Sequence, residues 1–198
     1  MRFAFSFIPT LTVIVAGCGA PNANAPRNAD HQQPEIAIRR GGSWSTLSYA
    51  PPHIVGPTFQ LELSKGVLSG FVSGAPMDVH IGQDEASGYG PSGPVQIAVE
   101  QREGDIQVEG MWNGGPVHFT FDPESLSGLV VWRRGRTMAS EQACAYQLTT
   151  AQPGTLIGTS SCGGMSMGTR LEVDPRLAKM MTPTEMTVVL VAALASPP

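Results

Sequence analysis

The 198-residue chain has few charged, cysteine and aromatic residues. Charged side chains make up 14% of the sequence and aromatic ones 7%, and there are three cysteines. The formal net charge of −4 is unfavourable for nucleic acid, which needs a basic face. No Walker loop, dinucleotide-binding glycine pattern or Cys-x-x-Cys pair is present. We therefore expect no nucleic-acid partner and no cofactor.

Metal ligands are also sparse in the sequence. None of the four histidines, His31, His53, His80 and His118, lies near a cysteine or near another histidine. The acids at 84–85 and 122–124 fall in expected loops, where carboxylates are commonly solvated, although paired carboxylates also bind calcium or cleave sugars. We expect no metal site.

The chain lacks a hydrophobic run long enough to span a membrane. Residues 3–16 are apolar apart from Ser6, Thr10 and Thr12, and the run is shorter than the roughly 20 residues that a spanning helix needs. It follows Arg2 and ends in small residues. These features are typical of a signal peptide.

The residues Val15-Ala16-Gly17-Cys18 at the end of this run resemble the lipobox of bacterial lipoproteins. The resemblance covers residues 1–18. It implies that residues 1–17 are removed, that a diacylglyceryl group joins the sulfur of Cys18, and that the new amine can be acylated. Each buried methylene of such chains contributes about 0.8 kcal/mol, so two or three chains hold a protein on a membrane. The alternative is an ordinary secretory leader.

The same resemblance implies a location in the cell envelope. Gly19, rather than an aspartate, follows Cys18, and in families with this signal that choice favours the outer membrane of diderm bacteria. The expected partner is the membrane, through the anchor at Cys18. Envelope proteins are further candidate partners.

The mature chain divides into three segments by composition. Residues 18–43 are rich in Asn, Ala, Pro and Gln and predict a flexible tether. Residues 44–173 alternate apolar and polar side chains, as at Phe59, Leu61 and Leu63, which predicts antiparallel strands. We expect a mainly β domain of about ten strands, forming a barrel or a two-sheet sandwich, because so many strands do not form one flat sheet. Residues 174–198 predict a helical tail.

An internal repeat relates residues 68–81 to residues 108–121. Each copy predicts a hairpin, and Asn113-Gly114 favours its turn because both residues tolerate positive φ. Centring the hairpins on the glycines places Gly70 opposite Val79 and Gly110 opposite Phe119. A third, degraded copy at 156–167 would place Ser160 on the buried face.

Cys144 and Cys162 are symmetric about the turn motif Pro153-Gly154. A hairpin turning there brings the two cysteines opposite each other, within reach of a disulfide. Export to an oxidising compartment favours the bond. We expect a disulfide that contributes on the order of 3 kcal/mol.

The tail contains signals for two helices. Asp174-Pro175 predicts the start of a short helix that ends at Met180. Thr182 and Glu185 form a capping box, which predicts a second helix from Pro183 to about Ala195. This helix is apolar nearly all round, so we expect it to pack over an open end or edge of the β domain. Docking onto a partner is the alternative.

Two short motifs suggest further functions. Residues 164–168 match the G-x-S-x-G pattern of hydrolases, with Ser166 as nucleophile, but the flanks predict strands and no histidine follows position 118. Gly42-Ser43-Trp44 resembles the start of lipocalins and implies a closed barrel that holds a small ligand. An empty interior lined by Trp44, Trp112, Phe119 and Phe121 would favour such a carrier. Otherwise Trp44 is expected in the core.

We thus expect an envelope lipoprotein that is a non-catalytic binding or assembly component and not an enzyme. It would dock through exposed strand edges or the helical tail. The alternatives are a carrier of a small apolar ligand with a lipocalin-like barrel and, last, an envelope serine hydrolase using Ser166.

Overall fold

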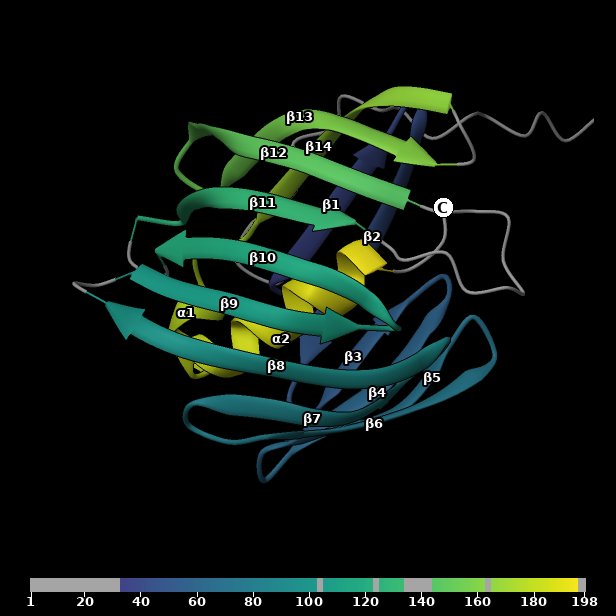
Figure 1. Ribbon diagram of the computed structural model, residues 1–198, viewed down its shortest axis with the longest axis vertical. Coiled ribbons are helices and arrows are strands. Elements are labelled where there is room, and N and C mark those ends of the chain that lie inside the picture. The colour runs from purple at the N-terminus through teal and green to yellow at the C-terminus, as the bar shows by residue number, and fades with distance from the viewer. Residues whose placement is uncertain (1–32, 103–104, 123–124, 134–143, 163–164, 196–198) are drawn as a thin grey trace, which may run out of the picture. The chain divides into compact units, whose positions relative to one another are not determined.

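The computed structural model describes residues 33–102, 105–122, 125–133, 144–162 and 165–195. In these residues, fourteen antiparallel strands form one sheet, which closes into a barrel because the first strand pairs with the last (Figure 1). The fold is therefore mainly β, as predicted. The expected count of about ten strands was too low. Many strands are short and are joined by two-residue turns, so the chain accommodates more of them.

The elements follow the chain in simple order. They are β1 (Glu35–Arg40), β2 (Ser43–Ala50), β3 (His53–Gly56), β4 (Phe59–Ser64), β5 (Val67–Val72), β6 (Ala75–Ile81), β7 (Glu85–Gly90), β8 (Gly93–Arg102), β9 (Asp105–Trp112), β10 (Gly115–Asp122), β11 (Ser127–Arg133), β12 (Cys144–Gln152), β13 (Thr155–Cys162), β14 (Met165–Val173), α1 (Leu177–Met180) and α2 (Pro183–Ala195).

The alternation of the sequence places one face of each strand inside the barrel. In β8, Val95, Ile97 and Val99 are buried, whereas the residues between them are exposed. The predicted inner residues of β4 and β10 are buried in the same way. The period of two therefore defines the core.

The two predicted hairpins form, but their registers differ from the prediction by two residues. Gly110 lies opposite Val117 rather than Phe119, and Gly70 lies opposite Met77 rather than Val79. Each turn consists of two residues alone; in β9–β10, Asn113 and Gly114 have φ values of 52° and 76°. The predicted centre was therefore one residue too late. A slip of two residues keeps the same face inside.

Glycines recur where a strand bends tightly against the preceding strand. A Cβ on Gly70, Gly110 or Gly158 would lie closer than 3.0 Å to a carbonyl oxygen of the neighbouring strand. Gly56, Gly88 and Gly128 are placed similarly, so every odd-numbered strand from β3 to β13 carries one. Repeated glycines that permit close approach and bending favour closure of the sheet.

The β domain begins earlier than predicted. Strand β1 lies within the segment 18–43 that was expected to be a tether, and it pairs with both β2 and β14. Its inward residues Ile36 and Ile38 are buried. The strand has only six residues and its pairing is with the far end of the chain, so the local pattern did not reveal it.

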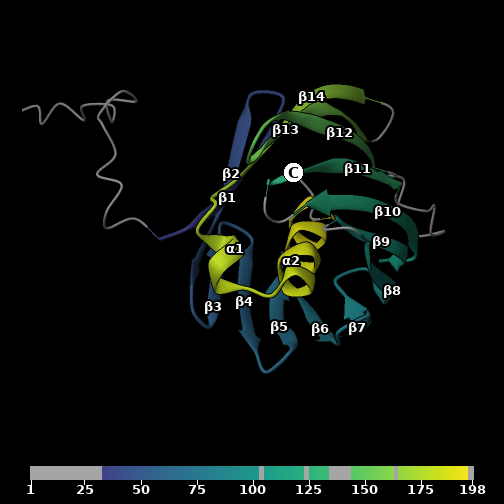
Figure 2. The same ribbon diagram turned by 90° about the vertical axis from the view of Figure 1, so that its left-hand side faces the viewer.

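The tail belongs to the core rather than to a separate segment. Helix α2 has the predicted bounds, and its capping box is confirmed: the Glu185 amide donates to Thr182 Oγ1 at 3.2 Å, and the Thr182 amide donates to Glu185 Oε2 at 2.8 Å. All residues from Met186 to Ala195 are buried. Figure 2 shows α2 inside the ring of strands instead of over an end or edge of it. No helix among the described residues is long and apolar enough to cross a membrane.

Candidate interaction surface

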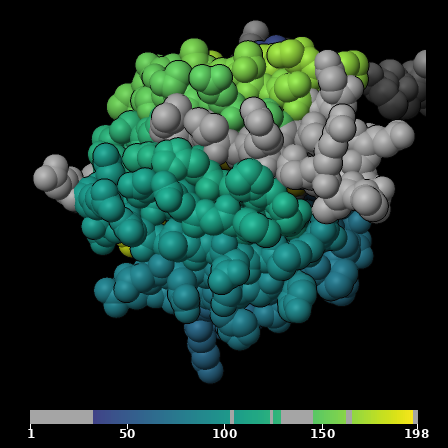
Figure 3. All heavy atoms as spheres, viewed as in Figure 1, coloured from purple at the N-terminus to yellow at the C-terminus, as the bar shows by residue number. Residues whose placement is uncertain are grey.

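The barrel interior is filled by side chains. Trp112, Phe119 and Phe121 are almost wholly buried and belong to one core cluster with α2. In the space-filling view, the strands β8 to β10 form a continuous outer wall in front of the helix (Figure 3). Among the described residues, Trp112, Phe119 and Phe121 therefore pack into the core rather than around an open ligand cavity.

Trp44 lies on the outside of the barrel. It is 49% exposed, and the Arg39 guanidinium lies 5.8 Å from the centre of its ring. The expectation that Trp44 is a core residue or lines the interior was wrong. In β2 the odd-numbered residues Leu47 and Tyr49 point inward, so Trp44 falls on the opposite face.

A buried arginine holds the carboxyl end of α2. Arg40 is only 6% exposed, and its Nη2 donates to the carbonyl oxygens of Ala193 and Leu194, both at 3.2 Å. Carbonyls in the last turn of a helix have no helical donor and carry partial negative charge, so a cation is stabilising there. The guanidinium also lies 5.7 Å from the ring centre of Tyr146. Burial raises the pKa of the Tyr146 hydroxyl, and Arg40 partly offsets this.

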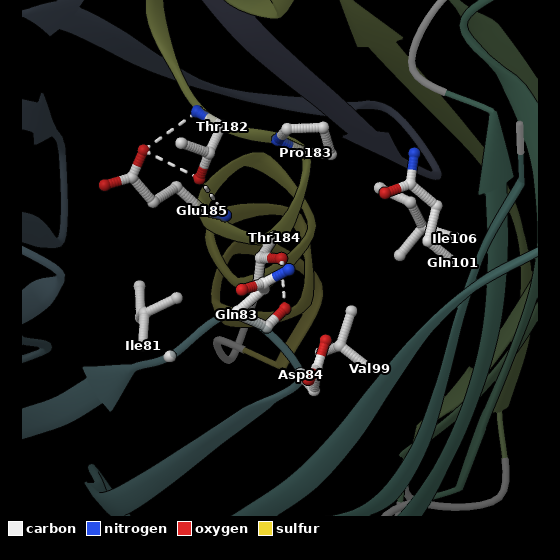
Figure 4. Close-up of a pocket in the computed structure, with 11 residues that line it drawn as sticks. Ile81, Gln83, Asp84, Val99, Gln101, Ile106, Thr182, Pro183, Thr184 and Glu185 are labelled. Atoms are coloured by element: carbon white, nitrogen blue, oxygen red, sulfur yellow. Dashed lines mark hydrogen bonds between the residues drawn. The ribbon is translucent and has the colours of Figure 1, made fainter.

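The amino end of α2 borders a cavity of about 480 Å³ (Figure 4). The apolar side chains of Ile81, Val99 and Ile106 line part of it, together with polar groups from the β6–β7 turn and the start of α2. The Thr184 hydroxyl donates to the Gln83 carbonyl oxygen at 3.1 Å, which joins the helix to that turn. Polar contacts therefore fix α2 at both ends of the barrel.

Large apolar side chains are exposed on the outer face at one end of the barrel. We call them the apolar belt, and they range from Met111 at 47% exposed to Tyr89 at 71%. The belt consists of Trp44, Val55, Phe71, Tyr89 and Met111. Each lies two residues from a two-residue turn that joins an odd-numbered strand to the next one. Because strands in an antiparallel meander alternate in direction, these turns all lie at the same end.

Three belt residues have an exposed proline directly opposite. Phe71 pairs with Pro76, Tyr89 with Pro94 and Met111 with Pro116. The apolar surface therefore extends onto the following even-numbered strand, whereas the preceding even-numbered strand places Gln60, Asp78 and Gln96 opposite the same three residues. The internal repeat in the sequence contains two of these pairs, Phe71 with Pro76 and Met111 with Pro116. The sequence prediction concerned only the inward-facing residues of that repeat.

Charge is distributed unequally between the two ends of the barrel. The turns beside the belt, at 41–42, 57–58, 73–74, 91–92 and 113–114, contain no charged residue. Among the side chains that the structure describes, Arg39 opposite Trp44 and Asp78 opposite Tyr89 are charged groups next to belt residues, and Arg40 is buried at the same end. The opposite end, where α2 begins, carries most of the acids: Glu35, Asp84, Glu85, Asp105, Asp122, Asp174 and Glu185.

The cysteines of the predicted disulfide are paired in the sheet. Cys144 in β12 lies directly opposite Cys162 in β13, on either side of the turn at Pro153-Gly154. The predicted register is confirmed, and the bond itself stays a prediction. The lipobox and Cys18 lie outside the described residues, as does His31.

Two histidines, His80 and His118, lie on the outer face of the barrel. His80 Nε2 lies 3.6 Å from Asp78 Oδ1, and His118 Nδ1 lies 3.1 Å from Glu109 Oε1. Within the described ranges, no three His, Cys, Asp or Glu residues are grouped so as to hold a metal ion. These contacts are therefore local pairs on the barrel wall.

Ser166 occupies a different setting from a hydrolase nucleophile. It is exposed near the start of β14, opposite Ser161, whereas a nucleophile elbow requires a turn from a strand into a helix. The nearby Ser160 is buried, as the third repeat predicted, and its hydroxyl lies 2.6 Å from that of Thr169.

Comparisons with known proteins identify no relative of this chain: no family model, curated protein or solved structure matches it. The candidate surface is therefore defined by the geometry of the barrel.

Proposed function

We propose that the protein is a lipid-anchored component of the bacterial cell envelope that works by binding rather than by catalysis. The lipobox sequence ending at Cys18 supports the anchor. The observation that carries the binding role is the apolar belt, exposed at one end of a barrel whose interior is already filled. Large apolar side chains that are exposed together at one end of a protein commonly mark an interaction site.

The belt replaces the docking routes expected from the sequence. Closure pairs β1 with β14, so these strands offer no free edge, and α2 is buried in the core. Binding through the outer surface requires neither element to move.

The two alternatives need other features. A carrier that used the centre of the barrel would need the volume that α2 occupies, which leaves it the cavity of about 480 Å³ at the amino end of the helix. A hydrolase needs Ser166 to be activated by a base. The proposed binding role uses the barrel as it stands.

Affinity isolation of the native protein from detergent-solubilised envelopes tests this function. We expect envelope lipids or proteins to co-purify, as identified by mass spectrometry. We also expect equal, background-level ester hydrolysis from the wild type and from Ser166→Ala. Hydrolysis that Ser166→Ala abolishes, with an unchanged circular dichroism spectrum, would contradict the proposal.

A further inference from the structure

The apolar belt has the composition and position of a lipid-contacting surface. We infer that it rests in the headgroup region of a bilayer, with the barrel standing on that end. Trp44 and Tyr89 each combine an apolar ring with a polar group, and such side chains favour the membrane–water interface. This inference extends the proposed function. It rests on that function in one respect, because the lipid anchor at Cys18 is what would bring the barrel to a membrane.

The depth of the belt fits an interfacial position. Its residues lie two positions from the turns, which corresponds to about 7 Å at the usual rise of a strand. Apolar groups of interfacial proteins are buried by about 5–10 Å. On the outer face, Glu62 and Glu109 lie four positions from the turns, or about 13 Å along their strands, whereas Asp78 lies directly opposite Tyr89 and so borders the belt. A bilayer boundary between these levels would cover the belt, leave Glu62 and Glu109 in water and place Asp78 at the boundary itself.

The belt surrounds part of the barrel rather than gathering on one side of a strand pair. Its members come from β2, β3, β5, β7 and β9, a stretch of neighbouring strands in the barrel order. The exposed prolines on β6, β8 and β10 fill positions between and beyond them. A bilayer extends across the ends of several neighbouring strands, so one such surface reaches residues on all of them.

The charges favour the same orientation. The uncharged turns at the belt end can enter headgroups without desolvating an ion, and Arg39 beside Trp44 is attracted to anionic phosphates. The acids at the opposite end then point away from the negative lipid surface.

The length of the chain before the barrel permits this orientation. Strand β1 starts at the end opposite the belt. The residues from Cys18 to Pro34 span up to about 56–61 Å when fully extended. The ten-residue β8 is about 33 Å long. An anchor at Cys18 can therefore reach the bilayer on which the belt rests.

Binding to vesicles by the unacylated mature chain isolates the belt from the anchor. The chain begins at residue 18, carries Cys18→Ser, and is mixed with phosphatidylethanolamine–phosphatidylglycerol vesicles. Burial of a large apolar side chain is a principal source of affinity for an interface. Even half-buried, Phe71 and Met111 together should contribute enough that Phe71→Ser with Met111→Ser weakens partitioning about tenfold or more. The matched control is Ile157→Ser with Met180→Ser, two exposed apolar residues outside the belt.

Quenching by brominated lipid locates the contact. The sequence has three tryptophans, so the experiment uses a Trp132→Phe background. In this background Trp44 should be quenched in the same vesicles, and Trp44→Phe should remove the quenched component while the buried Trp112 stays unaffected. Equal partitioning of the belt and control variants would overturn the inference, as would self-association in solution that the belt substitutions abolish. Because the chain carries no lipid, these outcomes are independent of whether native Cys18 is acylated.

Discussion

Cys144 and Cys162 lie directly opposite each other in the antiparallel strands β12 and β13. Opposed residues in such a pair have Cα separations that suit a disulfide. The sequence predicts this register from the symmetry of the two cysteines about Pro153-Gly154, and the structure contains it.

The first prediction concerns this pair. We expect that an alkylating reagent does not react with Cys144 or Cys162 in the native protein until the protein is reduced, as measured by peptide mass spectrometry. Cys144→Ser with Cys162→Ser should lower the free energy of unfolding by about 3 kcal/mol, because the bridge restricts the unfolded chain. Reduced wild type is the control and should match the double variant. Alkylation of both cysteines without reduction would contradict the prediction.

The second prediction concerns the arginine at the end of α2. Arg40→Met should lower the free energy of unfolding by about 2–3 kcal/mol, because the carbonyls of Ala193 and Leu194 lose their donor inside the barrel. Urea unfolding measures the difference. Arg39→Met is the matched control: its side chain is exposed, so its contact with Trp44 is worth about 0.5–1 kcal/mol. Equal losses from the two variants would argue against a specific role for Arg40.

The third prediction concerns the bending glycines. Gly110→Ala should lower the free energy of unfolding by about 3 kcal/mol, because its Cβ would press on the Gln96 carbonyl oxygen and its φ is 142°. Gly168→Ala is the control, since a Cβ there has no atom within 4 Å, and we expect a change within about 0.5 kcal/mol. If Gly110→Ala does not fold, its soluble yield should fall while that of Gly168→Ala stays at the wild-type level. This difference would also show that a Cβ is not tolerated at position 110. Unchanged stability of Gly110→Ala would show that the sheet does not bend there.

The fourth prediction concerns pH. Burial raises the pKa of the Tyr146 hydroxyl above its ordinary value of 10.0, and Arg40 lowers it in part. The folded state therefore holds this proton more tightly than the unfolded chain, so stability is retained below pH 10.0 and decreases as the pH rises toward the folded-state pKa. Unfolding measured across this range should show a smaller loss for Tyr146→Phe than for the wild type. Superimposable profiles would contradict the raised pKa.

Local signals in the sequence predict much of the fold. The apolar alternation identifies inward residues such as Phe119, and the capping box at Thr182 and Glu185 gives the bounds of α2. The turn residues also predict where the hairpins are. They do not fix the register of the paired strands, because that register depends on whether the turn has two residues or four. Such signals are contained within a few neighbouring residues.

The remaining features depend on contacts between distant parts of the chain. Strand β1 belongs to the barrel because it pairs with β14, at the far end of the chain. The apolar surface of α2 predicts that the helix is buried, but it does not predict that the helix lies inside the barrel. The orientation of Trp44 depends on which face of β2 closes inward.

The sequence contains a local pattern that indicates the belt, but the alternation of inward-facing apolar residues is the more prominent pattern in the same strands. An apolar residue follows a bending glycine at Gly70-Phe71, Gly88-Tyr89 and Gly110-Met111, two positions before each turn. Only the register shows that these three residues face outward together.

The mass of the mature amino-terminal peptide, taken from membranes, tests the lipid anchor most directly. We expect a peptide that begins at Cys18 and carries diacylglyceryl on sulfur, and we expect Cys18→Ser to lose both the acyl mass and its place in the membrane fraction. An unmodified Cys18, with Cys18→Ser remaining in membranes at the wild-type level, would contradict the account.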